Sequence, residues 1–317
     1  MNEKNICEKY ECPHCGNEVN RKYRFCPVCG EELEWEILAT KENRIMLKRE
    51  IAPMIKLIEI YNPLIASKAK PGQFVILRLH ERGKRFPLTI SGTSSEDGTV
   101  RLVFNEVGVA TKQLGNMNVG DRILNMPGPL GNPTEIRNFG TVLCFGGGVM
   151  IGPLLWIASA FREAGNYVIS VIGARTKDLL FFEDEIKAVS NEFYVATDDG
   201  SYGYRGLDFM KDILDEKDVN RVYGTSVATA TLKELCRITR PYGIETIVSL
   251  TPIMVDGSGM CGSCRVIVGG ERKFACVDGP EFNGHEVDWD LLELRKRMYS
   301  AEERVLSVYN EIAGFLS

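Results

Sequence analysis

The stretch "TVLCFGGGVMIGPLLWIASAFREAGNYVISVIGAR", residues 141–175, decides the fold of the larger part of this chain. An apolar run leads into three glycines, a second apolar run reads as a helix that ends at Gly165, and a third apolar run follows. This order predicts parallel strands joined by a helix. Doubly wound sheets bind a pyrophosphate at such a turn, so Gly146, Gly147 and Gly148 are candidate cofactor-binding residues. A tight turn without a ligand is the alternative.

The same alternation continues toward residue 250. Helix-like runs are expected at 178–190, 207–216 and 230–243, and strand-like runs at 192–200, 221–225 and 245–250. Residues 135–250 therefore predict a doubly wound parallel sheet with helices on both faces. The acidic turn "TDDGSYGYRG", residues 197–206, follows the third strand at the carboxyl edge, where a nucleotide lies in such sheets. Asp199 is the candidate binding residue there.

Residues 34–134 have a different pattern of apolar residues. Short β runs with turn signals between them are expected at 44–51, 55–61, 73–80, 87–93, 100–107 and 122–131. They predict a small antiparallel β-barrel. Only residues 109–117 read as a helix inside it.

Two motifs of this barrel can hold a cofactor. In "RFPLTIS", residues 85–91, an arginine fork can bind a pyrophosphate while the hydroxyl of Thr89 or the backbone meets a flavin edge. In "GVATKQL", residues 108–114, Gly108 and Thr111 open a helical segment whose free amides can bind a second phosphate. Each motif alone also fits a surface arginine or a simple helix cap.

The composition excludes several classes of protein. The chain has 317 residues, which suggests two or three domains, with 44% apolar and 26% charged residues. The net charge of −5 gives no electrostatic footprint for nucleic acid as the main partner. The longest apolar run, 142–160, is broken by glycines and Pro153, and the N-terminus lacks the apolar core of a secretory signal. We therefore expect a cytoplasmic protein without a membrane segment.

Seven of the ten cysteines fall into two groups that contain C-x2-C. In a large chain without a secretory signal, this pattern predicts metal binding rather than disulfides. The first group, "CPHCGNEVNRKYRFCPVCG", residues 12–30, has two C-P-x-C-G knuckles that supply four thiolates. Residues 1–33 therefore predict a zinc ribbon, and a rubredoxin-like iron site is the alternative. The predicted ligands are Cys12, Cys15, Cys26 and Cys29.

The second group lies in "PIMVDGSGMCGSCRVIVGGERKFACVDG", residues 252–279. The plant ferredoxin spacing C-x4-C-x2-C puts Asp256 where the first cysteine would stand before Cys261 and Cys264. Cys276 follows two strand-like runs, and this suits a cluster loop edged by a hairpin better than a zinc site. The glycines at 257, 259 and 262 suit a backbone that curls around a cluster. Asp256 alone can be read either as a turn residue before glycine or as an oxygen ligand.

The order of these parts resembles the ferredoxin–NADP reductase superfamily, in the branch with the electron-transfer subunit of dihydroorotate dehydrogenase. It is most similar to the small flavoprotein subunits of electron-bifurcating NADH-dependent ferredoxin:NADP oxidoreductases, also described as sulfide dehydrogenase small subunits. The resemblance covers roughly residues 36–300, without the N-terminal knuckles. It is carried by "RFPLTI" (85–90), "ISVIGARTKDLLFFEDE" (169–185), "TDDGSYG" (197–203), "TRPYGIETIVSLTPIMVDGSGMCGSCRV" (239–266) and "FACVDGPEFNGHEVDWD" (274–290).

This resemblance implies FAD in the barrel, NAD(H) on the sheet and a [2Fe-2S] cluster in the cysteine loop, residues 251–290. The cluster would pass electrons to a larger flavoprotein subunit that carries [4Fe-4S] clusters. The added zinc ribbon suggests docking of further redox subunits, and residues 291–317 are expected to form a C-terminal helix. The implied flavin contacts are Arg85, Phe86, Pro87, Leu88, Thr89, Gly108 and Thr111, and the implied cluster ligands are Asp256, Cys261, Cys264 and Cys276.

Two departures from the family pattern keep an alternative open. Met150 stands where the family's turn has a glycine, and Thr225-Ser226 replaces a Gly-Pro pair that is followed by methionines. The alternative is an electron relay that does not bind nicotinamide. Another class of function would be a zinc-ribbon docking or nucleic-acid-binding module on a redox-inactive scaffold. NAD and NADP are not distinguished, although Arg175 follows the second strand, where a 2′-phosphate can lie.

Overall fold

The computed structural model describes residues 10–12, 14–19, 23–33, 42–302 and 304–305. The chain divides into two compact units, Met1–Glu42 and Asn43–Ser317. In the first unit, β1 (Tyr10–Glu11) pairs antiparallel with β2 (Glu18–Val19). Among its described residues, the core consists of Cys12, Val19, Cys26 and Leu33, with Cys15 packed against it. Metal binding to these cysteines would contribute to the folding energy of so small a segment.

The second unit begins with five antiparallel strands in the order β3-β4-β7-β6-β5. They are β3 (Arg44–Ala52), β4 (Ile55–Tyr61), β5 (Phe74–Arg78), β6 (Arg85–Ser94) and β7 (Thr99–Asn105). Their inward residues, such as Ile58, Ile90 and Leu102, are fully buried in one core. The sheet closes through isolated bridges from Arg44 to Arg122 at one edge and from Phe74 to Leu130 at the other. The predicted β-barrel is therefore confirmed, with an irregular closing segment instead of a strand at 122–131.

One helix of the barrel was missed in the sequence. α2 (Pro63–Lys68) begins at Asn62, whose side chain accepts a hydrogen bond from the Ile65 amide, and Pro63 occupies the first turn. Asparagine as N-cap followed by proline is a known helix start, so the signal was present. The expected helix at 109–117 is α3 (Val109–Asn116).

The second half of this unit is a seven-stranded sheet in the order β11-β10-β9-β8-β12-β13-β16. All five expected strands are present as parallel strands: β8 (Thr141–Gly147), β9 (Tyr167–Ala174), β10 (Glu192–Thr197), β12 (Arg221–Ser226) and β13 (Glu245–Ser249). The edge strands β11 (Tyr204–Arg205) and β16 (Glu281–Asn283) were not foreseen, because two or three residues carry no periodic pattern. The chain runs outward from β8 and then returns to β12 on its other side, so these two strands are the topological switch point.

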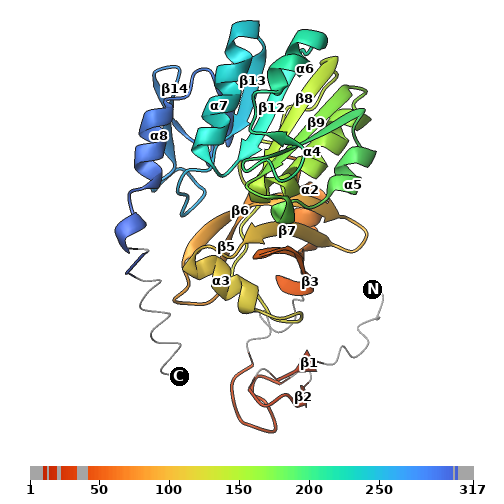
Figure 1. Ribbon diagram of the computed structural model, residues 1–317. Coiled ribbons are helices and arrows are strands. Elements are labelled where there is room, and N and C mark those ends of the chain that lie inside the picture. The colour runs from red at the N-terminus through yellow and green to blue at the C-terminus, as the bar shows by residue number, and fades with distance from the viewer. Residues whose placement is uncertain (1–9, 13, 20–22, 34–41, 303, 306–317) are drawn as a thin grey trace, which may run out of the picture. The chain divides into compact units, whose positions relative to one another are not determined.

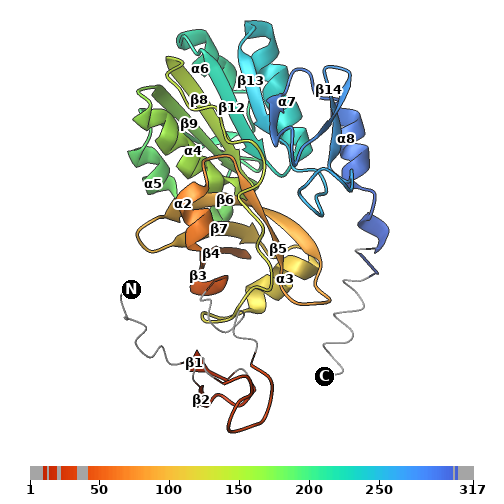
Figure 2. The same cartoon turned by 180° about the vertical axis from the view of Figure 1, so that it is seen from behind.

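Helices cover both faces of this sheet (Figures 1 and 2). Val142 and Cys144 face α4 and α5, whereas Leu143 and Phe145 face α6 and α7, because successive residues of a strand point to opposite faces. This arrangement confirms the predicted doubly wound sheet. The helices are α4 (Ile151–Glu163), α5 (Glu183–Ala188), α6 (Met210–Glu216) and α7 (Thr229–Thr239).

After β13 the chain forms a long loop, a hairpin and a helix. The hairpin joins β14 (Arg265–Val268) to β15 (Glu271–Phe274) through Gly269 and Gly270. Both glycines have positive φ, which a two-residue turn of this type requires. α8 (Trp289–Lys296) follows β16, and much of the predicted helix at 291–317 lies outside the described residues. In the described part of the chain, no helix has the length and apolar character needed to cross a membrane.

Candidate functional site

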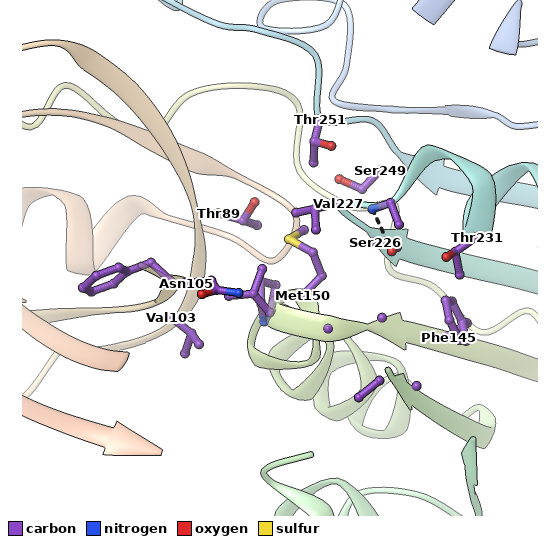
Figure 3. Close-up of a pocket in the computed structure, with 18 of the residues that line it drawn as sticks. Thr89, Val103, Asn105, Phe145, Met150, Ser226, Val227, Thr231, Ser249 and Thr251 are labelled. Atoms are coloured by element: carbon purple, nitrogen blue, oxygen red, sulfur yellow. Dashed lines mark hydrogen bonds between the residues drawn. The ribbon is translucent and has the colours of Figure 1, made fainter. Parts of the chain in front are cut away.

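A pocket of about 830 Å³ lies between the barrel and the carboxyl ends of the parallel strands. Its volume is in the range of sites for cofactors. Figure 3 shows its lining: Thr89, Val103 and Asn105 come from the barrel, and Phe145 and Ser226 from β8 and β12. The pocket therefore opens at the switch point of the sheet, where doubly wound folds bind nucleotides.

The barrel wall contains part of the predicted flavin motif. Pro87, Leu88 and Thr89 line the pocket, as does Thr111 of α3. Arg85, Phe86 and Gly108 lie outside the lining. Arg85 opens β6 and is exposed, whereas Phe86 packs against the barrel core. Gly108 is the N-cap of α3, where the Thr111 hydroxyl accepts from the Gly108 amide at 3.1 Å.

The glycine turn forms the other wall. Gly147 and Gly148 line the pocket, and Gly146 does not. Gly148 has φ +58 and open space where a side chain would be, which leaves room for a ligand against the backbone. Gly147 pairs in register with Ser226, and a Cβ on Gly147 would lie 2.8 Å from the Ser226 Oγ.

The two departures from the family pattern lie at this same place. Met150 is buried, and its thioether lines the pocket (Figure 3). The Ser226 hydroxyl accepts a hydrogen bond from the Ala228 amide at 3.1 Å, at the start of α7. Thr225 is buried beneath it, and its Oγ1 has no partner among the described residues.

The acidic turn contributes a different residue from the one expected. Asp198 lines the pocket together with Arg175. The Asp199 carboxylate instead accepts from the Ser201 amide at 2.9 Å. Hydrogen bonding from Ser201, that of its side chain first and that of its backbone amide second, lowers the pKa of Asp199. Asp199 therefore shapes the turn, and Asp198 is the carboxylate of this turn that lines the pocket.

The lining fits a flavin and a dinucleotide. Most of it is apolar, and a few polar groups converge on it: Thr89, Asn105, Ser226, Ser249 and Thr251. The Asn105 Oδ1 is buried and has no partner in the described part of the chain. A buried acceptor without a donor is unfavourable, so a ligand that donates a hydrogen bond there would satisfy it. Asn105 was missed because its sequence position is only that of a strand end.

The cysteine loop brings part of its predicted ligand set together. The sulfurs of Cys264 and Cys276 lie 3.2 Å apart and are buried. Cys261 is exposed, and its sulfur lies 3.1 Å from the Ser263 hydroxyl. The Asp256 carboxylate accepts from the amides of Ser258 and Cys261, both at 2.9 Å. These backbone hydrogen bonds, that of Ser258 first, lower the pKa of Asp256, so the group is an anion fixed beside the cysteines.

The loop also has the backbone that a cluster requires. Gly257, Gly259 and Gly262 all have positive φ, as their proposed role of curling the chain demands. A Cβ on Gly257 would meet Leu130 and Ile76 of the barrel at less than 3 Å, and Met254, Cys264 and Cys276 share a core with Phe74 and Ile76 of β5. Three thiols and a carboxylate on such a loop fit an iron–sulfur cluster, and the loop lies directly against the barrel.

The knuckles of the first unit form a complete set of metal ligands. The four sulfurs of Cys12, Cys15, Cys26 and Cys29 lie within 4.8 Å of one another. The side-chain Nδ2 of Asn17 donates to the Cys15 sulfur at 3.3 Å. This hydrogen bond lowers the pKa of the Cys15 thiol to about 6. Zinc binds thiolates, and four converging sulfurs supply a full tetrahedral ligand set.

Comparison with known proteins identifies the family. A 47% identical relative in Thermotoga maritima, a homolog of the dihydroorotate dehydrogenase B (NAD(+)) electron transfer subunit, aligns over 84% of this chain and 94% of that protein. The chain belongs to the family of dihydroorotate dehydrogenase B electron transfer subunits. The subunit of Geobacillus thermodenitrificans is 32% identical over 79% of this chain and 99% of its own length.

Two segments of this chain match known metal-binding domains. The iron–sulfur cluster binding domain of dihydroorotate dehydrogenase B matches residues 251–288, and a zinc-ribbon domain matches residues 12–33. These matches confirm the predicted iron–sulfur and zinc-ribbon segments. They bear on the segments and not on individual ligands.

Solved structures agree with the predicted resemblance. A chain of the NADH-dependent reduced ferredoxin-NADP oxidoreductase, studied for flavin-based electron bifurcation, is 45% identical with a TM-score of 0.80 and covers 88% of this chain and 99% of its own. Phthalate dioxygenase reductase, at 17% identity and a TM-score of 0.51 over 71% of this chain and 85% of its own, shares the fold. The predicted family and class of activity, an electron-transfer oxidoreductase subunit, are therefore confirmed.

Proposed function

We propose that this chain takes hydride from NAD(P)H at FAD and passes single electrons through a [2Fe-2S] cluster to a partner flavoprotein subunit. The observation that carries the proposal is the composition of the pocket. Its walls come from the flavin motif of β6, from the switch point at β8 and β12, and from the segment that leads into the cysteine loop, with Thr251, Pro252 and Met254. One cavity thus adjoins all three predicted cofactor regions.

In this proposal, Leu88 and Thr89 hold the flavin ring on the barrel side. The Asn105 Oδ1, which has no partner among the described residues, accepts a hydrogen bond from the ligand. Gly147 and Gly148 let the dinucleotide approach the sheet. Bound FAD supplies the conversion between two-electron hydride transfer and one-electron transfer. The chain itself has only to orient the two rings and exclude water, so no acid–base pair is needed.

The proposed cluster ligands are Asp256, Cys261, Cys264 and Cys276. Their support is the matched iron–sulfur domain, the close pair of buried thiols and the anionic carboxylate at the Cys261 amide. The loop packs on β5, which keeps the path from the barrel short.

The proposed partner is a larger flavin and [4Fe-4S] subunit that contacts the cysteine loop. Around the exposed Cys261, the side chains of Val255, Met260 and Val277 are exposed, with Met260 at 90%. Apolar side chains gathered at an exposed surface are typical of a protein contact. The zinc ribbon is proposed to dock a further redox subunit, since Tyr23, Phe25 and Val28 are exposed on it.

The test is anaerobic purification followed by visible spectra, metal analysis, electron paramagnetic resonance and titration with NADH and with NADPH. We expect flavin bands, a [2Fe-2S] signal, and bleaching of the flavin by at least one nucleotide. Cofactors without bleaching by either nucleotide would leave the electron-relay alternative, in which Met150 blocks the cleft. A colourless protein would favour the docking module.

A restoring variant sharpens the test of that alternative. In the relay case, Met150→Gly should allow bleaching that the unchanged chain does not show, because it removes the thioether from the pocket. Met46→Gly, at an exposed methionine of β3 outside the pocket lining, is the control and should change nothing.

A further inference from the structure

Helix α8 contacts the cysteine loop through the side chain of Arg295. The Nη2 of Arg295 donates to the carbonyl of Ser263 at 3.0 Å. Ser263 stands between Cys261 and Cys264 in the sequence. A cation is therefore held against the backbone between two proposed cluster ligands.

The guanidinium of Arg295 is incompletely satisfied. Its Nε is buried and has no hydrogen-bond partner in the described part of the chain. An unpaired buried donor carries a free-energy cost, and arginine has five donors in a rigid fork. A sulfur acceptor in the loop would remove this cost, because hydrogen bonds from the protein to cluster sulfurs are a normal part of such sites.

The charge of Arg295 also has no ion-pair partner in the part of the chain that the structure describes. Among the described residues, no carboxylate forms an ion pair with Arg295, whereas Arg297 on the same helix pairs with Glu293. Burial lowers the pKa of Arg295, as does the neighbouring Arg265, while Tyr299 and Cys264 raise it. Arginine stays protonated in proteins, so its positive charge acts on the loop.

The neighbouring residue fixes the helix that carries this charge. The Nζ of Lys296 donates to the carbonyl of Val227 at 2.6 Å and to the Thr251 hydroxyl at 3.2 Å. Both acceptors belong to residues that line the pocket. With this anchor beside it, Arg295 keeps its place against the cysteine loop.

On the basis of the proposed function, we propose that Arg295 is a positioning residue that sets the reduction potential of the [2Fe-2S] cluster. Reduction brings one electron from the reduced flavin to the cluster and adds one negative charge, with no bond made or broken. A nearby cation stabilises the charge that is added. Arg295 therefore raises the potential and favours electron flow from the flavin into the cluster.

The test is a redox titration of the anaerobically purified full chain, with dithionite as reductant and the cluster followed by electron paramagnetic resonance. Arg295→Gln keeps a donor for the Ser263 carbonyl and removes the charge. We expect the ratio of reduced to oxidised cluster at the wild-type midpoint to fall about tenfold, which is about 59 mV for one electron. Arg295→Lys keeps the charge and should stay within about twofold of wild type. Arg297→Gln, at an exposed arginine, is the control and should match wild type.

The outcomes distinguish an effect of the Arg295 charge on the potential from a structural effect of the substitution. A potential that is unchanged in Arg295→Gln overturns the proposal, and so do equal shifts in the Gln and Lys variants. If Arg295→Gln loses its cluster, Arg295→Lys decides: a wild-type potential supports the proposal, and a shifted potential or a lost cluster overturns it. A wild-type chain that shows no cluster signal contradicts the proposed function instead, so the two failures are distinguishable.

Discussion

Asp256 occupies the position at which plant-type cluster loops have their first cysteine. Its carboxylate accepts from the Ser258 and Cys261 amides, which is also what an aspartate does in an ordinary turn. A carboxylate has further lone pairs after two hydrogen bonds, so the turn and the ligand role are compatible. Spectroscopy of variants has to separate them.

We predict that Asp256→Cys keeps the cluster with a shifted potential, because thiolate replaces carboxylate at iron. Asp256→Ala should make the cluster labile. Cluster content and potential are measured by visible spectra and redox titration under anaerobic conditions. Asp218→Ala, at an exposed carboxylate between α6 and β12, is the control. An unaltered spectrum and potential in Asp256→Ala would show that Asp256 is not a ligand.

Glu281 is a half-buried carboxyl group where three parts of the second unit meet. Its Oε1 accepts from the Thr134 hydroxyl at 2.6 Å and from the Tyr223 hydroxyl at 2.7 Å. Burial raises the pKa of Glu281 to about 7. The hydrogen bonds from Thr134 and Tyr223 and the charge of Arg221 lower the pKa, but by less than burial raises it. The folded protein therefore keeps this proton at pH values where the unfolded chain has released it.

This pKa predicts a pH dependence of stability. The contribution of Glu281 is fully present below the unfolded pKa of about 4.3 and is lost as pH rises to about 7. Glu281→Gln keeps the acceptor but cannot titrate. From pH 5 to 7, the free energy of unfolding of wild type should fall relative to Glu281→Gln by up to about 1.4 kcal/mol per pH unit.

Denaturant unfolding at fixed cofactor concentration measures this difference. Glu286→Gln, at an exposed carboxylate of the same segment, should run parallel to wild type across the window. If the free energy of unfolding of Glu281→Gln also ran parallel to that of wild type from pH 5 to 7, the raised pKa of Glu281 would be contradicted.

The elements of the second unit were largely predictable because each carried a repeated pattern. β8, β9 and α4 are long apolar runs punctuated by glycines, and the hairpin β14–β15 follows from two β runs around Gly269-Gly270. β11 and β16 were not predictable, since their pairing is determined by the neighbouring strands. The segment 122–131 reads as a strand but only bridges the two barrel edges.

The candidate site was predictable in kind and less so in its individual residues. Thr89, Gly147 and Gly148 line the pocket as expected. Asp198 lines the pocket, whereas the Asp199 carboxylate accepts a hydrogen bond within the turn, and Asp199 as a cofactor contact stays a prediction. Arg295 and Asn105 had no sequence signal, because only tertiary packing buries the Arg295 Nε and the Asn105 Oδ1 without a partner among the described residues. The assignment of Asp256 as a cluster ligand stays a prediction.

The acidic turn after β10 depends on one glycine. Gly203 has φ +67, and a Cβ there would lie 2.2 Å from the backbone carbonyl oxygen of Val195. Gly243 has a similar φ of +65 with open space around it. Gly203→Ala and Gly243→Ala both place alanine in the left-handed region at about 1–2 kcal/mol.

We predict that Gly203→Ala costs substantially more than this, because the backbone carbonyl cannot move without breaking the β10 pairing. Gly243→Ala should cost only the backbone strain. The free energy of unfolding from denaturant titration checks both variants. Equal losses would mean that the turn shifts freely.

At the scale of the whole molecule, the zinc ribbon and the redox body are separate units. Changing Cys26 and Cys29 to serine should remove about one zinc per chain, because two of four ligands are lost. The flavin and cluster spectra should stay unchanged. His14→Ala is the control, since His14 lies in a knuckle but outside the four-thiol site. Loss of flavin in the serine variant would show that the units depend on each other.

The connection between barrel and sheet has a consequence for how this protein is made. Asn132, in that connection, donates through its Nδ2 to the carbonyls of Val277 and Asp278, and its amide donates to Gly279. β16 then pairs with β13. Synthesis proceeds from the N-terminus, so both halves leave the ribosome before the segment that joins them. The flavin pocket gains its last wall, including Pro280, only after both the barrel and the parallel strands have been made, and cofactor loading should therefore follow synthesis of the cysteine loop.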